Sequence, residues 1–530
     1  MFKKKRFKFS MCLMLVLSTF LAVSPVSAAN TATFGEVKII TNINTFVDAG
    51  PDARGIRPGT FGSEYARLTK LSDGTWLCAL TIYDNNGYTH MSSWGGTRLQ
   101  VFKSTDNCRT WKLISTIADN NRDLDNAQIV QLPNGELRLA ARSVRWQESY
   151  RIYIYKSTDG GVTWPYLSTL DSNEGTAGSL GNPDKGIYEP HFQILNDGSL
   201  ACFYANEKHV TENPSYSQII SERISNDGGA TWGKEIWVAW DNNSAGRPGM
   251  PVVTKMANGN YIVVFEVVGT QDANIFCKTS SDGKTWASGI GTKIPGQKAG
   301  PYITSLSDGR LMVTSCTNNL SFSLDYGASW YTNDQQPWTF GYNLDWSSVY
   351  QTGTNEIAAV TSVPRTEGGH NVQIKFASIL PLKSINSGKQ YKLSSKCSND
   401  TMCLDVSEGS IAAGANVQQW NDNGLNPQKW TIISTNDGYY KLINVQSGMA
   451  LEVVNDYTND GANVQQWNDN GADCQKWRIE DLGNGYCKLV NKNSGKCLDV
   501  NANSATAGEN VQQWSDNGYD AQCWKLVQLN

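Results

Sequence analysis

A short turn sequence that recurs along the chain decides the fold. Residues 157–164 read STDGGVTW, in which a serine is followed two residues later by an acidic residue, then by glycine and a closing tryptophan. In such a turn the Asp accepts backbone N–H groups, Gly permits a positive φ, and Trp packs over the turn. The pattern returns as STDNCRTW at 104–111, SNDGGATW at 225–232, SSDGKTW at 280–286 and SLDYGASW at 323–330. Copies about fifty to seventy residues apart indicate an internally repeated fold.

A hairpin lies ahead of each of these Asp turns and completes the repeat unit. It consists of two alternating strands joined by an Asp-Gly or Asn-Gly turn, a sequence typical of tight hairpins. The copies begin at Tyr65, Ala127, Glu189, Met250 and Gly300, and a sixth, from Trp346, keeps the strands without the glycine-rich turn. With one strand before the Asp turn and another after it, the unit has four strands, which predicts an all-β, six-bladed β-propeller. A five-bladed ring would match the Asp turns but would leave the strand-like sequence from Trp346 unused.

The sixth blade has no Asp turn of its own, so its outer strands have to come from elsewhere. Asn371–Leu382 supplies one alternating strand and Val37–Val47 supplies another. We therefore predict that the N-terminal strand closes the ring and that the propeller spans residues 30–383.

Strand direction sorts the residues between the two faces of the ring. If each inner strand runs from face A to face B, the Asp turns lie on face B, so Asp106, Asp159, Asp227, Asp282 and Asp325 are predicted to be structural. Face A collects the starts of inner strands and the ends of second strands. The residues expected there include Tyr65, Arg67, Asp123, Asp125, Arg142, Arg145, Tyr188, Glu189, His191, Glu207, Arg247, Glu266 and Tyr302.

Two glutamates on face A are candidates for catalysis. Glu189 begins the inner strand of the third blade, and Glu266 ends the apolar run YIVVFE of the fourth. Taken singly, Glu266 fits better as a strand-end residue paired with an arginine, and Glu189 as a loop carboxylate at a contact between blades. Because the two lie on neighbouring blades and on one face, together they favour a catalytic pair of carboxyl groups. Retaining glycosidases hold such carboxyls about 5 Å apart and inverting ones hold them further apart.

The other residues of face A are candidates for substrate binding. His191 could orient Glu189 or be a satisfied, partly buried histidine, and Asp125 could contact substrate or belong to a loop. The arginines, Arg247 among them, could clamp an anionic sugar or, more commonly, neutralise nearby carboxylates. Tyr65, Arg67, Tyr188 and Tyr302 complete the predicted substrate-binding set.

The Asp turns together with YEPHFQILNDGSLACFY, GMPVVTKMANGNYIVVFE and AGPYITSLSDGRLMV make the propeller resemble the exo-arabinanases of glycoside hydrolase family 93, which share the sialidase-like propeller. The resemblance implies release of arabinobiose from α-1,5-L-arabinan with retention, by two glutamates that match Glu189 and Glu266. Of these two, we expect Glu189 to be the acid/base and Glu266 the nucleophile, an assignment that the resemblance itself leaves open. A sialidase is the competing enzyme, but Arg67 is followed by Leu68 and Thr69, so the Arg-Ile-Pro motif of sialidases is absent. A non-catalytic propeller lectin is the third alternative.

Composition limits the partners of the protein. The 530 residues carry a formal net charge of −4, with 18% charged residues and 18 tryptophans. Such a surface has no general basic character, so we expect no nucleic-acid partner. No CxxC pair or HExxH motif is present, so no metal or cofactor is indicated.

The N-terminus reads as a secretory signal peptide, residues 1–28. A basic start is followed by an apolar stretch, Met11–Val23, and a small-residue cleavage site at Val26-Ser27-Ala28. We expect a secreted, monomeric protein without a membrane anchor. Cys78 and Cys202 stand at equivalent places in two repeats and are predicted to be buried thiols, whereas Cys397 with Cys403, or Cys487 with Cys497, could pair.

From residue 384 the repeat length changes to about forty-seven residues. VQQWNDNG begins at Val417 and Val464, and VQQWSDNG at Val511, each followed by a Gln-x-Trp motif. Three such repeats resemble a ricin-B-type β-trefoil, the architecture of carbohydrate-binding module family 13, over residues 384–530.

The resemblance implies three sugar sites, each with an acidic residue, an amide and a stacking aromatic. These sites are Asp405, Gln418 and Trp420; Glu452, Gln465 and Trp467; and Asp499, Gln512 and Trp514. Trp430, Trp477 and Trp524 are expected to build the core. Where the family often has Asn before the Gln-x-Trp, this chain has Pro427, Cys474 and Ala521, and Glu452 makes the middle site the weakest. The predicted partner of the whole protein is a polysaccharide such as arabinan.

Overall fold

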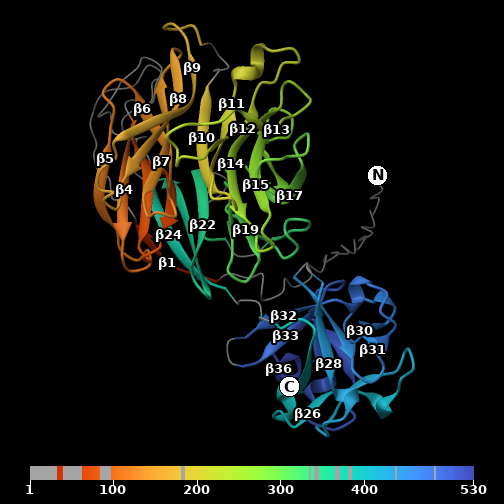
Figure 1. Cartoon of the computed structure of the whole chain (residues 1–530). Helices are drawn as coiled ribbons and strands as arrows, with labels where there is room; N and C mark the ends of the chain where they lie inside the picture. Colours follow the sequence, from red (N-terminus) through yellow and green to blue (C-terminus); the bar gives the residue numbers. More distant parts are fainter. Residues whose placement is uncertain are drawn as a thin grey trace, which may run out of the picture.

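The computed structural model describes residues 33–39, 62–83, 97–180, 186–332, 336–338, 345–364, 370–379, 383, 385–435, 438–482 and 485–529. Across these ranges the regular elements are β-strands and short 3-10 turns. The strands form six four-stranded sheets and one twelve-stranded sheet. The predicted all-β fold, a six-bladed propeller followed by a β-trefoil, is confirmed (Figure 1). The predicted signal peptide, residues 1–28, lies outside the described residues. Of the helical turns that the structure does describe, none has the length and apolarity that a membrane crossing requires.

Blades 1 to 3 each contain four antiparallel strands in chain order. Blade 1 contains β2 (Ser63–Lys70), β3 (Trp76–Tyr83), β4 (Thr97–Ser104) and β5 (Lys112–Ile117). Blade 2 contains β6 (Asp123–Gln131), β7 (Leu137–Arg145), β8 (Ser149–Ser157) and β9 (Tyr166–Glu174). Blade 3 contains β10 (Ile187–Ile194), β11 (Leu200–Asn206), β12 (Ile219–Ser225) and β13 (Ile236–Ala239), with the 3-10 turn η3 (Lys208–Thr211) after β11.

Blades 4 and 5 repeat this arrangement, and blade 6 closes the ring. Blade 4 contains β14 (Arg247–Lys255), β15 (Tyr261–Val268), β16 (Asn274–Ser280) and β17 (Thr292–Lys298), and blade 5 contains β18 (Tyr302–Ser305), β19 (Leu311–Thr314), β20 (Ser321–Ser323) and β21 (Tyr331–Thr332). Blade 6 contains β22 (Asp345–Gly353), β23 (Glu356–Pro364), β24 (His370–Ser378) and β1 (Thr33–Ile39). Strand β1 pairs antiparallel with β24, as the predicted N-terminal closure requires, although it begins before Val37.

The Asp turns have the hydrogen bonds that their sequence predicts. Asp159 Oδ1 accepts the Ser157 hydroxyl at 2.7 Å and the backbone N–H groups of Val162 and Thr163, both at 3.0 Å. The Trp164 indole donates to the Gly161 carbonyl at 2.9 Å and so covers the turn. Equivalent bonds between the serine hydroxyl and the aspartate recur at Asp106, Asp227, Asp282 and Asp325.

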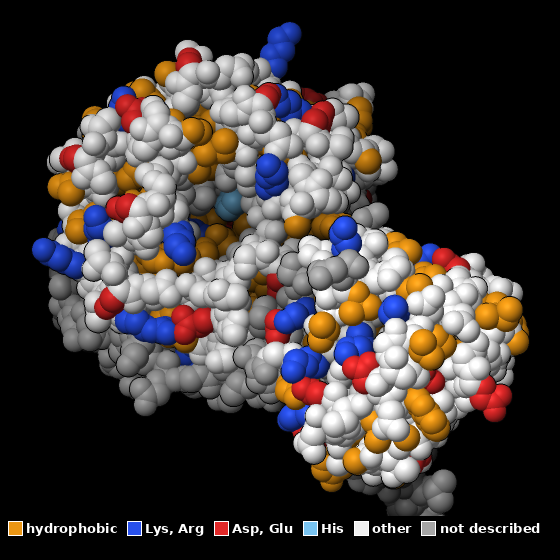
Figure 2. Space-filling model, turned by 60° about the horizontal axis from the view of Figure 1, so that its bottom comes forward, with side chains coloured by type: hydrophobic (Ala, Val, Ile, Leu, Met, Phe, Trp, Pro, Cys, Tyr) orange, Lys and Arg blue, Asp and Glu red, His pale blue; other side chains and the backbone are white. Residues whose placement is uncertain are grey.

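Apolar side chains fill the space between the blades. Cys78 and Cys202 are fully buried, as predicted, because each stands on a second strand packed between two sheets. All cysteines in the described part of the chain are free thiols, so neither of the candidate bridges, Cys397 with Cys403 or Cys487 with Cys497, is formed. Figure 2, in which the lower end of the molecule comes forward, shows a hollow at the centre of the ring of blades.

The trefoil is built from three repeats of four strands. Its strands are β25 (Lys389–Ser395), β26 (Met402–Val406), β27 (Val417–Asn421), β28 (Trp430–Ser434), β29 (Tyr440–Asn444), β30 (Ala450–Val453), β31 (Val464–Trp467), β32 (Trp477–Asp481), β33 (Cys487–Asn491), β34 (Cys497–Val500), β35 (Val511–Trp514) and β36 (Trp524–Gln528). Its 3-10 turns are η4 (Lys396–Ser398), η5 (Ser407–Gly409), η6 (Asn426–Gln428), η7 (Val454–Asp456), η8 (Asp473–Gln475), η9 (Asn501–Asn503) and η10 (Asp520–Gln522).

Two sets of equivalent residues hold the three trefoil repeats together. Trp430, Trp477 and Trp524 are fully buried, as expected, and each indole donates to a backbone carbonyl at 3.0–3.1 Å. The side-chain amides of Asn416, Asn463 and Asn510 form a closed triangle of hydrogen bonds of 2.9–3.0 Å. The threefold repetition of the sequence is therefore a threefold repetition of contacts.

The trefoil contacts the propeller at an Asp turn, on face B. Gly438, two residues ahead of β29, lies against blade 5, because a Cβ there would collide with the Leu324 carbonyl. The hydroxyls of Tyr331 and Tyr439 are 3.3 Å apart across the same contact. The trefoil thus occupies the face opposite to the predicted catalytic face.

Candidate active site

Five of the six inner strands of the propeller are interrupted by the same bulge near face A. The register shifts by one residue in the first hairpin of blades 1, 2, 3, 4 and 6. At each bulge, and at the equivalent position of blade 5, one residue has a left-handed backbone. The six residues are Tyr65, Asn126, Glu189, Met250, Gly300 and Trp346, with φ between 52° and 57°. Bulges re-aim side chains, and left-handed non-glycine residues are held in place by their surroundings.

The bulge is the part of the site that the sequence analysis missed. Its sequence signal is a proline after the left-handed residue, at Pro190, Pro251 and Pro301. Proline lacks the N–H that a regular strand would use, so in strands it is typical of bulges and strand starts.

The bulges hold the two candidate carboxylates. Glu189 Oε2 accepts the N–H of Met250 at 2.8 Å, and Glu266 Oε2 accepts the N–H of Gly300 at 2.8 Å. Each donor is the left-handed residue of the next blade. One repeated backbone feature therefore orients both carboxylates.

Gly249 lies beside both carboxylates. A Cβ at this residue would stand 3.7 Å from Glu189 Oε2 and 3.7 Å from Glu266 Oε1. The distance between these two oxygens is therefore at most twice 3.7 Å. The structure thus brings the predicted pair together, and a side chain at position 249 would contact both carboxylates and collide with Gln218 Nε2 at 2.7 Å.

The surroundings give the two carboxyls different proton affinities. Burial, followed by the charge of Glu266, raises the pKa of Glu189 to about 7 against the opposing Met250 N–H. Burial also raises the pKa of Glu266, but the Gly300 N–H and the positive charge of Arg247 oppose this rise. Glu189 is thus suited to hold a proton near neutral pH, and Glu266 is the better candidate for the ionised partner.

Glu207 organises the side of the site next to Glu266. This residue is buried at the end of β11. Its Oε2 accepts the Tyr188 hydroxyl at 2.8 Å and the Gly186 N–H at 2.8 Å, while Oε1 is ion-paired with Arg247. Arg247 also donates to Gln218 Oε1 at 2.9 Å. Arg247 therefore neutralises a carboxylate, the commoner of its two predicted roles.

Asp125 and Arg142 lie on the other side of Glu189. Their side chains form an ion pair at 3.1 Å, and the Arg142 guanidinium lies 4.7 Å from the centre of the Tyr188 ring. Burial raises the pKa of Asp125, and Arg142 opposes this rise. Asp125 Oδ1 is buried with no hydrogen-bond partner in the structure. The negative charge of Asp125 also contributes to the raised pKa of Glu189, so the two carboxyls lie near each other.

The remaining predicted site residues pack around the axis of the ring. The Arg67 guanidinium lies between the rings of Tyr65 and Tyr302, 4.1 Å and 5.2 Å from their centres. His191 Nδ1 accepts the Val253 N–H at 3.3 Å, so its hydrogen bond goes to the backbone and not to Glu189. Burial and the Arg67 charge lower the pKa of His191 to about 3, which keeps the ring neutral. The side chains of Tyr65, Arg67, His191 and Tyr302 are all buried.

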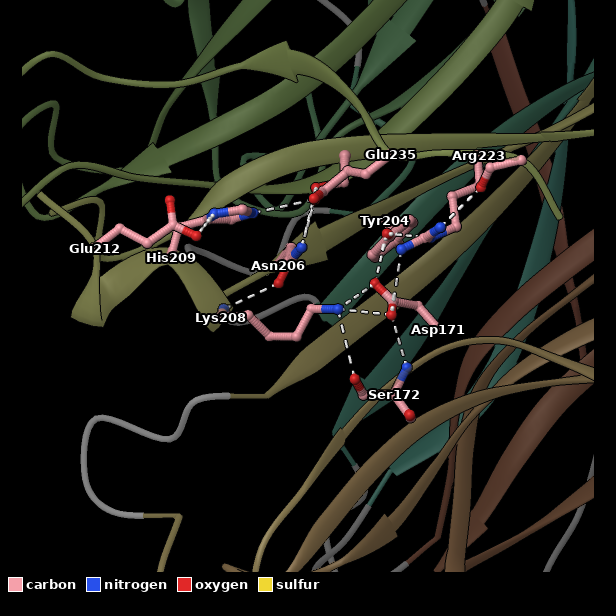
Figure 3. Close-up of polar contacts among 11 residues, drawn as sticks. Asp171, Ser172, Tyr204, Asn206, Lys208, His209, Glu212, Arg223 and Glu235 are labelled. Carbon is pink, nitrogen blue, oxygen red and sulfur yellow. Dashed lines mark hydrogen bonds and ion pairs between the residues drawn. The ribbon is translucent and has the colours of Figure 1, made fainter. Parts of the chain in front are cut away.

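A polar network fixes the chain that follows Glu207. Figure 3 shows Lys208, Tyr204 and Arg223 converging on Asp171, and His209 between Glu212 and Glu235. Although burial disfavours its charge, the bonds to Glu235 and Glu212 raise the pKa of His209. The η3 turn is thereby anchored to the outer strand of blade 2 and to blade 3.

The trefoil presents the three predicted sugar sites with one common geometry. The amide of Gln418, Gln465 or Gln512 donates at 3.0 Å to the acidic residue of its repeat, which is Asp405, Glu452 or Asp499 respectively. Trp420, Trp467 and Trp514 are 40%, 39% and 38% exposed, so one face of each ring is open to solvent. A pocket of about 810 Å³ lies at Trp420 and one of about 350 Å³ at Trp514.

Comparisons with known families agree with both parts of the fold. Residues 57–244 match the BNR repeat-like domain. Residues 375–467, 426–514 and 473–530 match the ricin-type beta-trefoil lectin domain-like family. No curated protein sequence matches the chain.

Two fungal structures are similar to this chain. The GH93 alpha-L-arabinofuranosidase of Fusarium graminearum, solved with arabinobiose, is 21% identical with a TM-score of 0.51, over 60% of this chain and 93% of that one. The alpha-L-arabinanase of Penicillium chrysogenum, also complexed with arabinobiose, is 22% identical with a TM-score of 0.50, over 67% of this chain and 99% of that one. At this identity the likeness establishes the fold.

Proposed function

We propose that this chain, a BNR-repeat propeller joined to a ricin-type β-trefoil, is a secreted glycoside hydrolase that removes arabinobiose from the ends of α-1,5-L-arabinan with retention. The observation that carries the proposal is the pair Glu189 and Glu266, held on adjacent blades on either side of the position that a Cβ of residue 249 would take. The similarity to structures of arabinan-degrading enzymes supports arabinan as the substrate.

In the proposed reaction the two carboxyls have different roles. Glu189, with its pKa raised to about 7, donates a proton to the oxygen of the leaving sugar. Glu266, ionised beside Arg247, attacks the anomeric carbon and forms a glycosyl-enzyme ester. Glu189 then takes a proton from water, whose oxygen replaces Glu266 at that carbon. The second displacement restores both groups and the original anomeric configuration.

The neighbouring side chains position the substrate in this proposal. Tyr188, with its hydroxyl fixed by Glu207, and Asp125, with a buried oxygen that lacks a partner, provide hydrogen-bonding groups on either side of Glu189. The trefoil binds polysaccharide through the exposed rings of its three sites. Several weak sites on one polymer give avidity without any strong single contact.

The proposal is tested by incubating the protein with linear α-1,5-L-arabinan and identifying the product. We expect arabinobiose, and proton NMR during the first turnovers should show the α-anomer first. Absence of arabinobiose would refute the arabinan assignment, and initial release of the β-anomer would refute retention.

The two alternatives make different predictions. A sialidase needs arginines free to grip a carboxylate, whereas Arg142 and Arg247 are ion-paired with Asp125 and Glu207, and Arg67 is buried between aromatic rings. Cleavage of a fluorogenic sialoside would nevertheless favour that reading. A lectin would bind arabinan and leave it intact.

A further inference from the structure

A groove on the outer wall of the propeller lies away from the carboxylate pair and from the trefoil. It runs between β5 of blade 1 and the β8, β9 and Asp-turn region of blade 2, with a volume of about 900 Å³. Its walls come from two blades, so no single repeat of the sequence reveals it.

The groove is lined by the two most exposed large hydrophobic side chains of the described propeller. Among the described propeller residues, the exposed large hydrophobic side chains are Leu113, Val162, Tyr166 and Val268. Val162 and Tyr166, 52% and 57% exposed, line the groove, and Leu113 is on the strand that forms its wall. Exposed apolar surface gathered in one place is typical of binding sites.

Its aromatic side chains are held in place before any ligand arrives. The Tyr166 ring meets the Tyr153 ring edge-on at 5.2 Å, and its hydroxyl is 2.9 Å from Thr169 Oγ1. Tyr153 is fixed in turn by the Arg151 guanidinium, which donates to its hydroxyl at 3.0 Å. Rigid rings lose little freedom on binding, which favours stacking against a flat ligand face.

The groove has the same kinds of side chain as the trefoil pocket at Trp420. That pocket combines the carboxylates of Asp405 and Glu408 with asparagines, an exposed aromatic ring and the exposed Leu425. The groove combines Asp119 with Asn120, Asn121, Tyr166 and Val162. Sugars present apolar ring faces and many hydroxyls, so aromatic rings beside amides and a carboxylate suit them in both places.

The charges of the groove favour a neutral ligand. Arg151 is ion-paired with Glu174, and Asp119 adds a negative charge. An acidic polysaccharide would meet no unopposed cation among these groups.

From these observations we infer that the groove is a second polysaccharide-binding site, which takes an internal stretch of a neutral glycan chain on the wall of the propeller. It holds the polymer without cleaving it, and it goes beyond the proposed function because it requires no turnover.

Native gel electrophoresis through soluble polysaccharide tests the inference. The full-length protein would carry Glu189→Gln to prevent degradation and Trp420→Ala, Trp467→Ala and Trp514→Ala to silence the trefoil. The gels would contain linear arabinan, xylan or galactan. We expect retardation by at least one of them. Adding Tyr166→Ala should weaken the apparent affinity about fivefold, and Asn120→Ala about threefold.

Ile433→Ala provides the matched control, because it truncates an exposed apolar side chain on β28 outside the pockets, and it should leave retardation unchanged. Equal retardation with and without Tyr166→Ala and Asn120→Ala in folded protein would overturn the inference, as would no retardation in any gel. If the unmodified protein cleaves no arabinan but Tyr166→Ala still weakens retardation, the proposed function is refuted while the polysaccharide-binding site in the groove is supported.

Discussion

The two faces of the propeller repeat themselves in opposite ways. On face B the Asp turns repeat their residues, and each aspartate accepts the hydroxyl of the serine two residues before it. On face A the bulges repeat their backbone conformation while the residue changes from blade to blade. A turn that only stabilises its blade keeps the same residues in every repeat. A bulge that presents a side chain to the axis can carry a different side chain in each blade. Regular sequence therefore marks the scaffold, and irregular sequence on a regular backbone marks the site.

The sharpest test of this difference exchanges a carboxylate for an amide on each face. Glu266→Gln should lower kcat on arabinan by about a thousandfold or more, since the nucleophile is lost while the Gly300 contact is kept. Asp159→Asn on face B should leave kcat within about twofold, because its contacts lie within the turn. Initial rates measured by reducing-sugar release would decide, and similar losses in the two variants would contradict the division between the faces.

Glu207→Gln should reduce kcat/KM by about ten- to a hundredfold, because Arg247 loses its counter-charge and a single amide oxygen replaces the two oxygens that bind Tyr188 and Arg247. Without the opposing charge of Glu207, Arg247 should lower the pKa of Glu266 further. The acid limb of the pH profile should then move to lower pH, an effect that a purely structural defect would not produce. Glu235→Gln, which changes another carboxylate of blade 3, should leave that limb in place.

The pH dependence of the unmodified protein tests the role of Glu189. Its pKa, raised to about 7, means that the carboxyl is protonated below this pH and loses its proton above it. As a general acid it should therefore lose activity as the pH rises through 7, with kcat/KM falling about tenfold per pH unit beyond. Assays between pH 4 and 9 would show the limb, and activity that keeps rising above pH 8 would exclude Glu189 as the acid.

Gly249→Ala should lower kcat/KM about tenfold. The added methyl would stand 2.7 Å from Gln218 Nε2, which has to move, and 3.7 Å from an oxygen of each carboxylate. Gly353→Ala is the matched control, since its methyl would meet only the Glu356 Cβ at an ordinary 3.5 Å. Equal kcat/KM values for the two variants would show that the substrate does not need the space beside Gly249.

The smallest effect is expected from Asp159→Ala. The variant loses the bonds from the Val162 and Thr163 N–H groups, which should cost about 1 kcal/mol and lower Tm by a few degrees. Activity at room temperature should remain. Tm is measured by calorimetry and activity by the initial rate at 25 °C. A large loss of rate with an unchanged Tm would show that the turn belongs to the active site.

The sequence was sufficient for the fold because its information is local. Ser157, Asp159 and Trp164 meet within one turn, and repetition of that turn establishes the blade register. Strand register in turn places Glu189 and Glu266 on one face, which the structure confirms as a neighbouring pair of side chains.

Contacts between distant segments could not be predicted in this way. The partners of the carboxylates, Met250 and Gly300, depend on how neighbouring blades pack, and so does the ion pair of Glu207 with Arg247. For His191 the sequence left two roles open, orienting Glu189 or being a satisfied, partly buried histidine. The bulge after Tyr188 changes the register, and the His191 ring accepts the Val253 N–H, which fits the second role. The groove at Tyr166 was missed because its two walls belong to different repeats.

The closure of blade 6 bears on how the chain assembles. Strand β1 is synthesised before any other strand of the propeller, yet its partner β24 is the last one made. Five blades can form in order during synthesis, while the backbone N–H and C=O groups of β1 have no partner strand. The ring becomes one cooperative unit only when β24 arrives, so a chain that ends before residue 370 is expected to leave the circle open.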